Sequence, residues 1–186
     1  MKRGGMLYCA DVDAQRYKVL NARGQTAFTE ATDDEPLGGT AFTLDHAFRL
    51  RLLQDLIGGE SDDERYLGGL SVSFASFIVG NVMLRFEQHP LTHTGPRDCW
   101  AGVAVFEEET DKGDRDRFSD FFVGEIEQLS IWMQNASQRS NPEGGSLELV
   151  RVVIANASRA ARFVRSRAEE LGLPEAQGFY NAQVDQ

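Results

Sequence analysis

Four side chains with metal-binding chemistry lie close together in the sequence. Three residues separate His89 from His93, and Asp98 and Cys99 follow a few positions later. Imidazole, carboxylate and thiolate groups are the ligands that zinc takes in proteins. Pro90 excludes a regular helix here, and His-x3-His is one of many tolerated spacings. The sequence therefore leaves two interpretations: a zinc site formed by His89, His93 and Asp98, or a polar loop whose histidines face water, which we favour.

A second candidate site is the pair of carboxylates Asp11 and Asp13, which follows an apolar run at residues 6–10. On the end of a strand, side chains two positions apart point to the same face. Paired carboxylates in this arrangement can bind Mg²⁺. No further residues of such a site follow in the expected pattern, so we interpret the pair as solvated residues at a strand end.

Glu125 is the titratable residue with the most unusual predicted surroundings. A helix is predicted from about residue 114 to 138, and Glu125 falls within its apolar stripe. A carboxylate in that position must be paired, be protonated or lie at an opening in the core. We expect a buried carboxylate paired with an arginine such as Arg151, and proton transfer is the alternative role. The stripe contains Phe118, Phe121, Phe122, Ile126, Leu129, Trp132, Met133 and Ala136.

Charge is distributed unevenly along the chain. The formal net charge is −10, from 19 Lys+Arg and 29 Asp+Glu. Residues 107–127 include nine acidic residues, whereas residues 151–167 include five arginines and no acidic residue. Arg159 and Arg162, with Arg165 at the edge, lie on the polar side of a predicted helix and predict a binding face for a phosphate or an acidic surface. The net charge argues against nucleic-acid binding.

Length and composition are those of an ordinary globular chain. The 186 residues are 41% hydrophobic and 26% charged, which predicts a single domain spanning residues 1–186. No apolar stretch reaches about eighteen residues, and no apolar run of signal-peptide length follows the basic start of the chain. We therefore expect a cytoplasmic protein without a membrane segment, in which Cys9 and Cys99 are reduced by default.

Strands and helices are predicted to interleave without strict alternation. Short strands are predicted between residues 6 and 40 and at 99–106 and 147–154, with a hairpin at Gly80-Asn81. A buried helix over residues 70–80 is the alternative to the first strand of that hairpin. Helices are predicted at 43–57, at 114–138 and from Asn156 to Gly172.

This order predicts an α+β fold, with a mainly antiparallel sheet of about six strands and three helices against one face. Two of the helices fall in the C-terminal half. Acidic loops are predicted at 30–40 and 60–65, and a flexible tail at about 175–186.

The sequence contains no glycine-rich phosphate loop and no nucleophile elbow, which favours a binding protein over an enzyme. The predicted helix 43–57 is apolar around most of its circumference, so it must be covered on more than one side. We predict a non-enzymatic, acidic interaction or assembly subunit, such as an accessory or inhibitor protein that docks on a basic surface. It would act with a protein partner or as a homo-oligomer, without a cofactor. The alternative is a small metal-dependent hydrolase that uses His89, His93 and Asp98.

Overall fold

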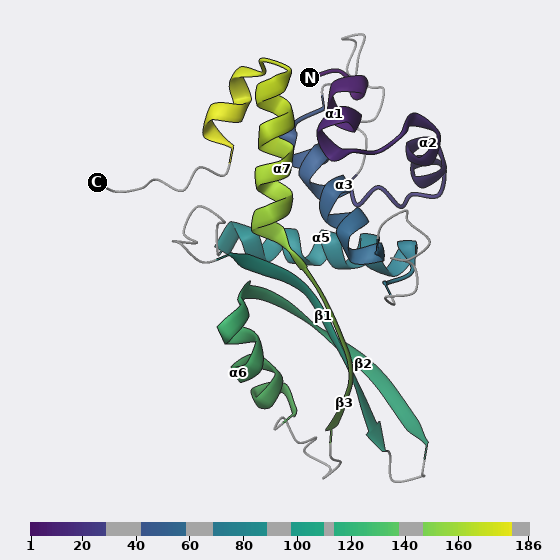
Figure 1. Cartoon of the computed structure of the whole chain (residues 1–186). Helices are drawn as coiled ribbons and strands as arrows, with labels where there is room; N and C mark the ends of the chain where they lie inside the picture. The colour runs from purple at the N-terminus through teal and green to yellow at the C-terminus, as the bar shows by residue number, and fades with distance from the viewer. Residues whose placement is uncertain (29–41, 59–68, 89–97, 110–113, 138–146, 180–186) are drawn as a thin grey trace, which may run out of the picture.

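The computed structural model describes residues 1–28, 42–58, 69–88, 98–109, 114–137 and 147–179. These residues form six α-helices, one 3-10 helix and one sheet of three strands. Most of the helices gather in a body, and the sheet extends from this body as an arm (Figure 1). The predicted α+β class is confirmed, whereas the predicted six strands and three helices are wrong.

The N-terminal segment is helical and contains none of the predicted strands within its described part. It forms α1 (Arg3–Ala10) and α2 (Ala14–Ala22). The Asp13 side chain accepts hydrogen bonds from two backbone N–H groups in the first turn of α2, and Asp11 ends α1 in the left-handed conformation. The two carboxylates therefore shape a turn between helices, not a strand end. Helical spacing is visible in the buried residues Met6, Cys9 and Ala10.

The helix predicted over residues 43–57 is confirmed as α3 (Leu44–Ile57). Thr43 caps its first turn, and Gly58 ends it with a φ of 82°, a conformation that favours glycine. Helices α1, α5 (Val72–Gln88) and α7 (Ala157–Glu170) pack around it. The chain itself therefore provides the cover that this apolar helix requires.

Residues 72–88 form the single helix α5, so the predicted hairpin is wrong and the alternative helix is correct. Leu70, Val72 and Phe74 alternate with small residues as in a strand, but a helical pattern of core residues overrides that alternation. Gly80 and Asn81 lie inside the helix instead of forming a turn. The buried side chains of α5 are Ala75, Ile78, Val79, Val82 and Met83.

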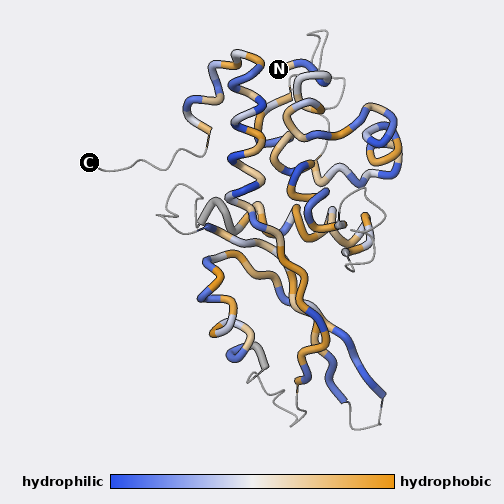
Figure 2. The backbone as a smooth tube through the Cα atoms, viewed as in Figure 1, coloured by the Kyte–Doolittle hydropathy of each residue, from blue (hydrophilic) through white to orange (hydrophobic). Residues whose placement is uncertain are grey.

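The sheet contains β1 (Cys99–Glu109), β2 (Arg115–Glu125) and β3 (Leu147–Asn156), in the order β2-β1-β3. Both pairings are antiparallel, as predicted for the sheet, and β1 is the central strand. The outer ends of β1 and β2 are hydrophilic, whereas the strands are hydrophobic where they approach the helical body (Figure 2). The arm therefore shares its core with the body only at its inner end.

The helix predicted at 114–138 is instead a strand followed by a helix, β2 and α6 (Ile126–Ser137). Phe118 and Phe122 are four residues apart, a spacing that places side chains on one face of a helix and also on one face of a strand. The sequence pattern alone is therefore ambiguous. Pairing with β1 along all eleven residues of β2 decides the outcome.

Helices lie on both faces of the sheet, not on one as predicted. On one face, the rings of Phe106 and Phe122 lie 6.5 and 5.4 Å from the ring of Trp132 in α6. On the opposite face, the ring of Phe121 lies 5.7 Å from the ring of Phe77 in α5. Adjacent residues of a strand point to opposite faces, so α5 and α6 are separated by the sheet.

The C-terminal elements begin as predicted. The side chain of Asn156 accepts a hydrogen bond from the backbone N–H of Arg159 and caps α7. A 3-10 helix, η2 (Pro174–Gly178), lies where a tail was predicted to begin, and Ala176 is buried there. The described part of the predicted tail therefore packs against α7 through η2.

The centre of the sheet allows a test of how closely its strands approach. A Cβ atom added at Gly102 in β1 would lie 2.1 Å from the carbonyl oxygen of Val153 in β3. We expect Gly102→Ala to lower the free energy of unfolding by about 2 kcal/mol, because backbone would have to move. Denaturant unfolding measures this loss. Gly4→Ala is the control, since no atom lies within 4 Å there, and equal stability of the two variants would contradict the packing.

The first turn of α3 contains a histidine that must be neutral to keep its hydrogen bond. Nδ1 of His46 accepts a hydrogen bond from the backbone N–H of Thr43 at 3.0 Å, and its ring lies 4.6 Å from that of Phe28. Burial lowers the pKa of His46 below its ordinary value of 6.5; Asp45 opposes this shift and Arg49 adds to it. The folded chain therefore binds this proton less readily than the unfolded chain.

Stability should consequently fall in mildly acidic solution. As the pH drops below about 6.5, the unfolded chain takes up a proton that the folded chain resists, so the free energy of unfolding decreases. Glutamine can accept the same capping hydrogen bond without titrating, so we expect His46→Gln to lose most of this dependence. Urea unfolding between about pH 7.5 and 5 measures it. The same pH dependence in both proteins would show that His46 is not responsible.

Candidate functional site

Asp98, predicted as a zinc ligand, is held in a clasp between the sheet and α7. Its Oδ1 and Oδ2 accept hydrogen bonds from the guanidinium of Arg162 at 2.7 and 3.1 Å, and Oδ2 also accepts one from Asn156 Nδ2 at 2.7 Å. The hydrogen bonds from Arg162, followed by that from Asn156, hold the pKa of Asp98 below its ordinary value. This carboxylate therefore joins the start of β1 to the start of α7.

The zinc hypothesis itself stays a prediction. His89 and His93 lie outside the described residues, so their distance from Asp98 is not defined. Among the residues that the structure describes, no three His, Cys, Asp or Glu side chains are grouped to hold a metal ion. Cys99 is buried, and burial raises its pKa to about 11, so the thiol is protonated near neutral pH. A cysteine binds zinc as a thiolate, so Cys99 would have to lose this proton to bind the metal.

The three arginines predicted as a binding face do not form one uniform cationic surface. Arg162 is bound to Asp98, and Nε of Arg165 donates a hydrogen bond to Glu169 at 2.9 Å. Arg159 is exposed next to the cap of α7. Acidic side chains from the same chain therefore offset much of the positive charge that the sequence places in this region.

Further arginines stabilise the contact of α7 with α1 and α3. The hydroxyl of Tyr8 accepts a hydrogen bond from Arg167 Nη1 at 2.9 Å and donates one to Glu170 at 2.6 Å. The guanidinium of Arg167 lies 4.7 Å from the centre of the Tyr8 ring, and that of Arg51 lies 4.4 Å from the centre of the Phe163 ring. Cation–π and hydrogen-bond contacts of this kind hold helices together, so these arginines have structural partners.

Glu125 is not surrounded by a helical apolar stripe. It is the last residue of β2 and is partly exposed, and its backbone N–H donates a hydrogen bond to Gln128 Oε1 at 3.0 Å. Arg151, named as its expected partner, donates a hydrogen bond to the carbonyl oxygen of Gly69 at 3.1 Å. Glu125 instead marks the passage from strand to helix.

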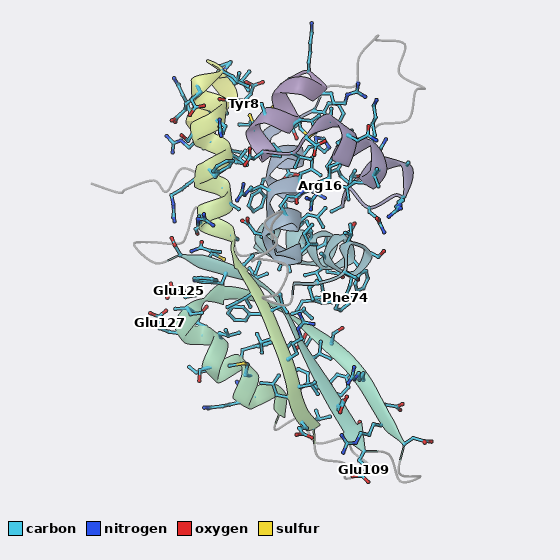
Figure 3. The ribbon with its side chains drawn as sticks, turned by 45° about the vertical axis from the view of Figure 1, so that its right-hand side comes forward. Tyr8, Arg16, Phe74, Glu109, Glu125 and Glu127 are labelled. Carbon is cyan, nitrogen blue, oxygen red and sulfur yellow. The ribbon has the colours of Figure 1, made fainter. Side chains whose placement is uncertain are left out.

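An uncovered apolar surface runs along α5 and reaches β2. Phe77 and Leu84 are 55% and 60% exposed, although both are large hydrophobic residues. The ring of Phe77 stacks with that of Phe74 at 6.3 Å and meets that of Phe121 edge-on at 5.7 Å. Phe74 lies in the first turn of α5 (Figure 3). We call this surface the α5 strip, and it consists of Phe74, Phe77, Gly80, Asn81, Leu84 and Phe121.

The composition of α5 distinguishes this strip from scattered surface hydrophobics. One side of the helix is buried against the core, and the strip occupies a second side. No charged residue occurs between residues 72 and 84. A helix at a protein surface normally has a polar side facing water, and contiguous exposed apolar surface marks contact sites. The strip is therefore the best candidate for a binding surface.

The composition of the sequence indicates the strip, although no motif does. Residues 72–84 are uncharged and include more apolar residues than one buried helical stripe requires. Interpreted as a hairpin, the segment placed Phe74 and Phe77 in a sheet. The second apolar side of α5 can be recognised only when the segment is assigned as a helix.

Comparisons with known proteins add no relative: no family model, no curated protein and no solved structure matches this chain. The described helices include none with the length and apolar character needed to cross a membrane.

The Asp98–Arg162 clasp can be tested by a double-mutant cycle. We expect Asp98→Ala and Arg162→Ala to lower the free energy of unfolding, with a coupling of about 1 kcal/mol, because the two hydrogen bonds are charge-assisted and bidentate. Arg165→Ala, which removes the exposed ion pair with Glu169 within α7, should cost only about 0.3–0.5 kcal/mol. A coupling of zero between the two residues would contradict the clasp.

Proposed function

We propose that this protein is an interaction or assembly subunit that binds another protein chain through the α5 strip and does not catalyse a reaction. The observation that carries the proposal is the exposure of Phe77 and Leu84 on an uncharged helix face that continues onto Phe121. Aromatic residues are enriched in protein interfaces, and a few of them supply most of the binding energy.

Burial of the strip would provide a substantial driving force. Removal of one large apolar side chain from water contributes about 1.5–3 kcal/mol. Phe77 and Leu84 are each more than half exposed, and Phe74 and Phe121 extend the same surface. Association costs several kcal/mol of translational and rotational freedom, so these side chains together can support binding of modest affinity.

The strip also changes which partner surface we expect. The sequence suggested a basic surface, on the strength of the net charge of −10. The residues of the strip carry no charge, so its partner should present uncharged apolar side chains. The overall charge then contributes solubility, not recognition.

The cytoplasm is the compartment that we propose for this protein. Cys9 and Cys99 are both buried free thiols, which fits a reducing compartment. The alternative hydrolase stays a prediction, because His89 and His93 lie outside the described residues.

Site-specific photo-crosslinking tests the proposed function. Replacement of Phe77 by benzoylphenylalanine keeps an aromatic ring at the centre of the strip. We expect irradiation of cells that express this variant to give a covalent adduct with another protein chain. Ile131 of α6, which is 61% exposed, is the matched control position. No adduct at position 77, or equal adducts at both positions, would contradict the proposal.

A further inference from the structure

We propose that the chain bound at the α5 strip is a second copy of this protein, with the two α5 helices antiparallel. This inference rests on the proposed function and names the partner of the same surface. Three features of the strip support it: the spacing of its large side chains, the open space at its centre, and its lack of charge.

The spacing of Phe77 and Leu84 is self-complementary. They are seven positions apart, so they lie on nearly the same side of α5 and about 10 Å apart along its axis. A two-fold axis passing between residues 80 and 81 would place Phe77 of each copy beside Leu84 of the other. Both copies would then contribute the same two side chains to the contact. Such an interface is isologous, because one patch meets its own copy.

The centre of the strip has room for a second helix. A Cβ atom added at Gly80 would meet no atom within 4 Å. Glycine inside a helix costs about 1 kcal/mol relative to alanine, and no close contact in the described part of the chain requires it at this position. In the antiparallel pair, Gly80 would lie at the two-fold axis, where a missing side chain lets two helices approach closely.

Asn81 also suits the centre of the pair. Its Nδ2 donates a hydrogen bond to the carbonyl oxygen of Phe77 at 2.8 Å, within the same helix. One N–H group of the amide is thus hydrogen-bonded before association, which lowers the free-energy cost of burying Asn81 in the contact. Asn81 of one copy would lie beside Asn81 of the other across the two-fold axis.

At this surface, charge neither selects an oppositely charged partner nor opposes a second copy. Each chain has a net charge of −10, so two copies repel each other wherever acidic surfaces meet. The segment 72–84 carries no charge and brings no like charges together. A basic partner would be selected by acidic side chains at the contact, and the strip supplies none. Salt should therefore strengthen the dimer, because it screens the repulsion between the two copies.

Phe74 and Phe121 broaden one end of the strip. Even so, a single helix with two flanking aromatic rings is smaller than the typical interface of about 800 Å² per partner. We therefore expect a reversible dimer with a Kd on the order of 10 µM.

Sedimentation equilibrium of the full chain over about 1 to 200 µM tests the dimer. We expect the mass to rise from that of the 20.7 kDa monomer towards twice that value. Phe77→Glu should raise the Kd at least tenfold, because it places a carboxylate in the apolar contact. Ile131→Glu makes the same change at an equally exposed position of α6 and should leave the Kd unchanged. A wild-type chain that stays monomeric, or equal effects of the two variants, would overturn the inference.

A cysteine introduced at Asn81 tests the arrangement of the two helices. Both native cysteines are buried, so mild oxidation should link two copies of Asn81→Cys through the new thiol. Ile131→Cys and the unmodified chain should stay unlinked. Failure of Asn81→Cys to crosslink, in a chain that does dimerise, would overturn the antiparallel pairing about this axis.

The two proposals fail in distinguishable ways. If the chain is monomeric while the photo-crosslinker at Phe77 captures a different protein, the second copy is excluded and the proposed function stands. If the chain is monomeric and no adduct forms, both are wrong.

Discussion

The structure depends on β1, the central strand, which is paired along both edges. Antiparallel ladders to β2 and β3 satisfy its backbone groups, and its two faces carry different helices. One face joins the core of the body beneath α5, and the other holds Phe106 against α6. The Asp98–Arg162 clasp fixes the start of this strand to α7. The buried side of α5 joins the same core, and its uncharged second side lies at the surface next to Phe121 of β2.

Local signals predicted the elements with well-defined ends. Thr43 and Gly58 bound α3, Asn156 caps α7, and β1 and β3 follow their runs of apolar residues. The wrongly predicted segments, 72–88 and 114–138, share one physical cause: the local spacing of their apolar residues fits both a helix and a strand. Phe118 and Phe122 satisfy helical and strand periodicity equally well, so only the tertiary pairing of β2 with β1 distinguishes the two. At the start of α5, large and small residues alternate as in a strand, although the longer pattern of apolar residues is helical.

The chemistry of single residues was harder to predict than the fold, because the neutralising partners are distant in sequence. Asp98 and Arg162 are 64 positions apart and were assigned to two different hypothetical sites, yet they bind each other. Glu125 seemed to be a buried charge only because the surrounding segment was interpreted as a helix. The strip on α5 could have been found from its lack of charge, had the helix been recognised.

The strip on α5 is the surface at which we propose that this protein meets another copy of itself. Amide hydrogen exchange of the full chain, measured by mass spectrometry at low and at high protein concentration, tests it most directly. We expect exchange to slow at high concentration in peptides covering residues 72–84 and in the part of β2 around Phe121, while exchange in peptides of α6 is unchanged. Exchange in α5 that is independent of concentration, or protection that appears elsewhere in the chain, would contradict the claim.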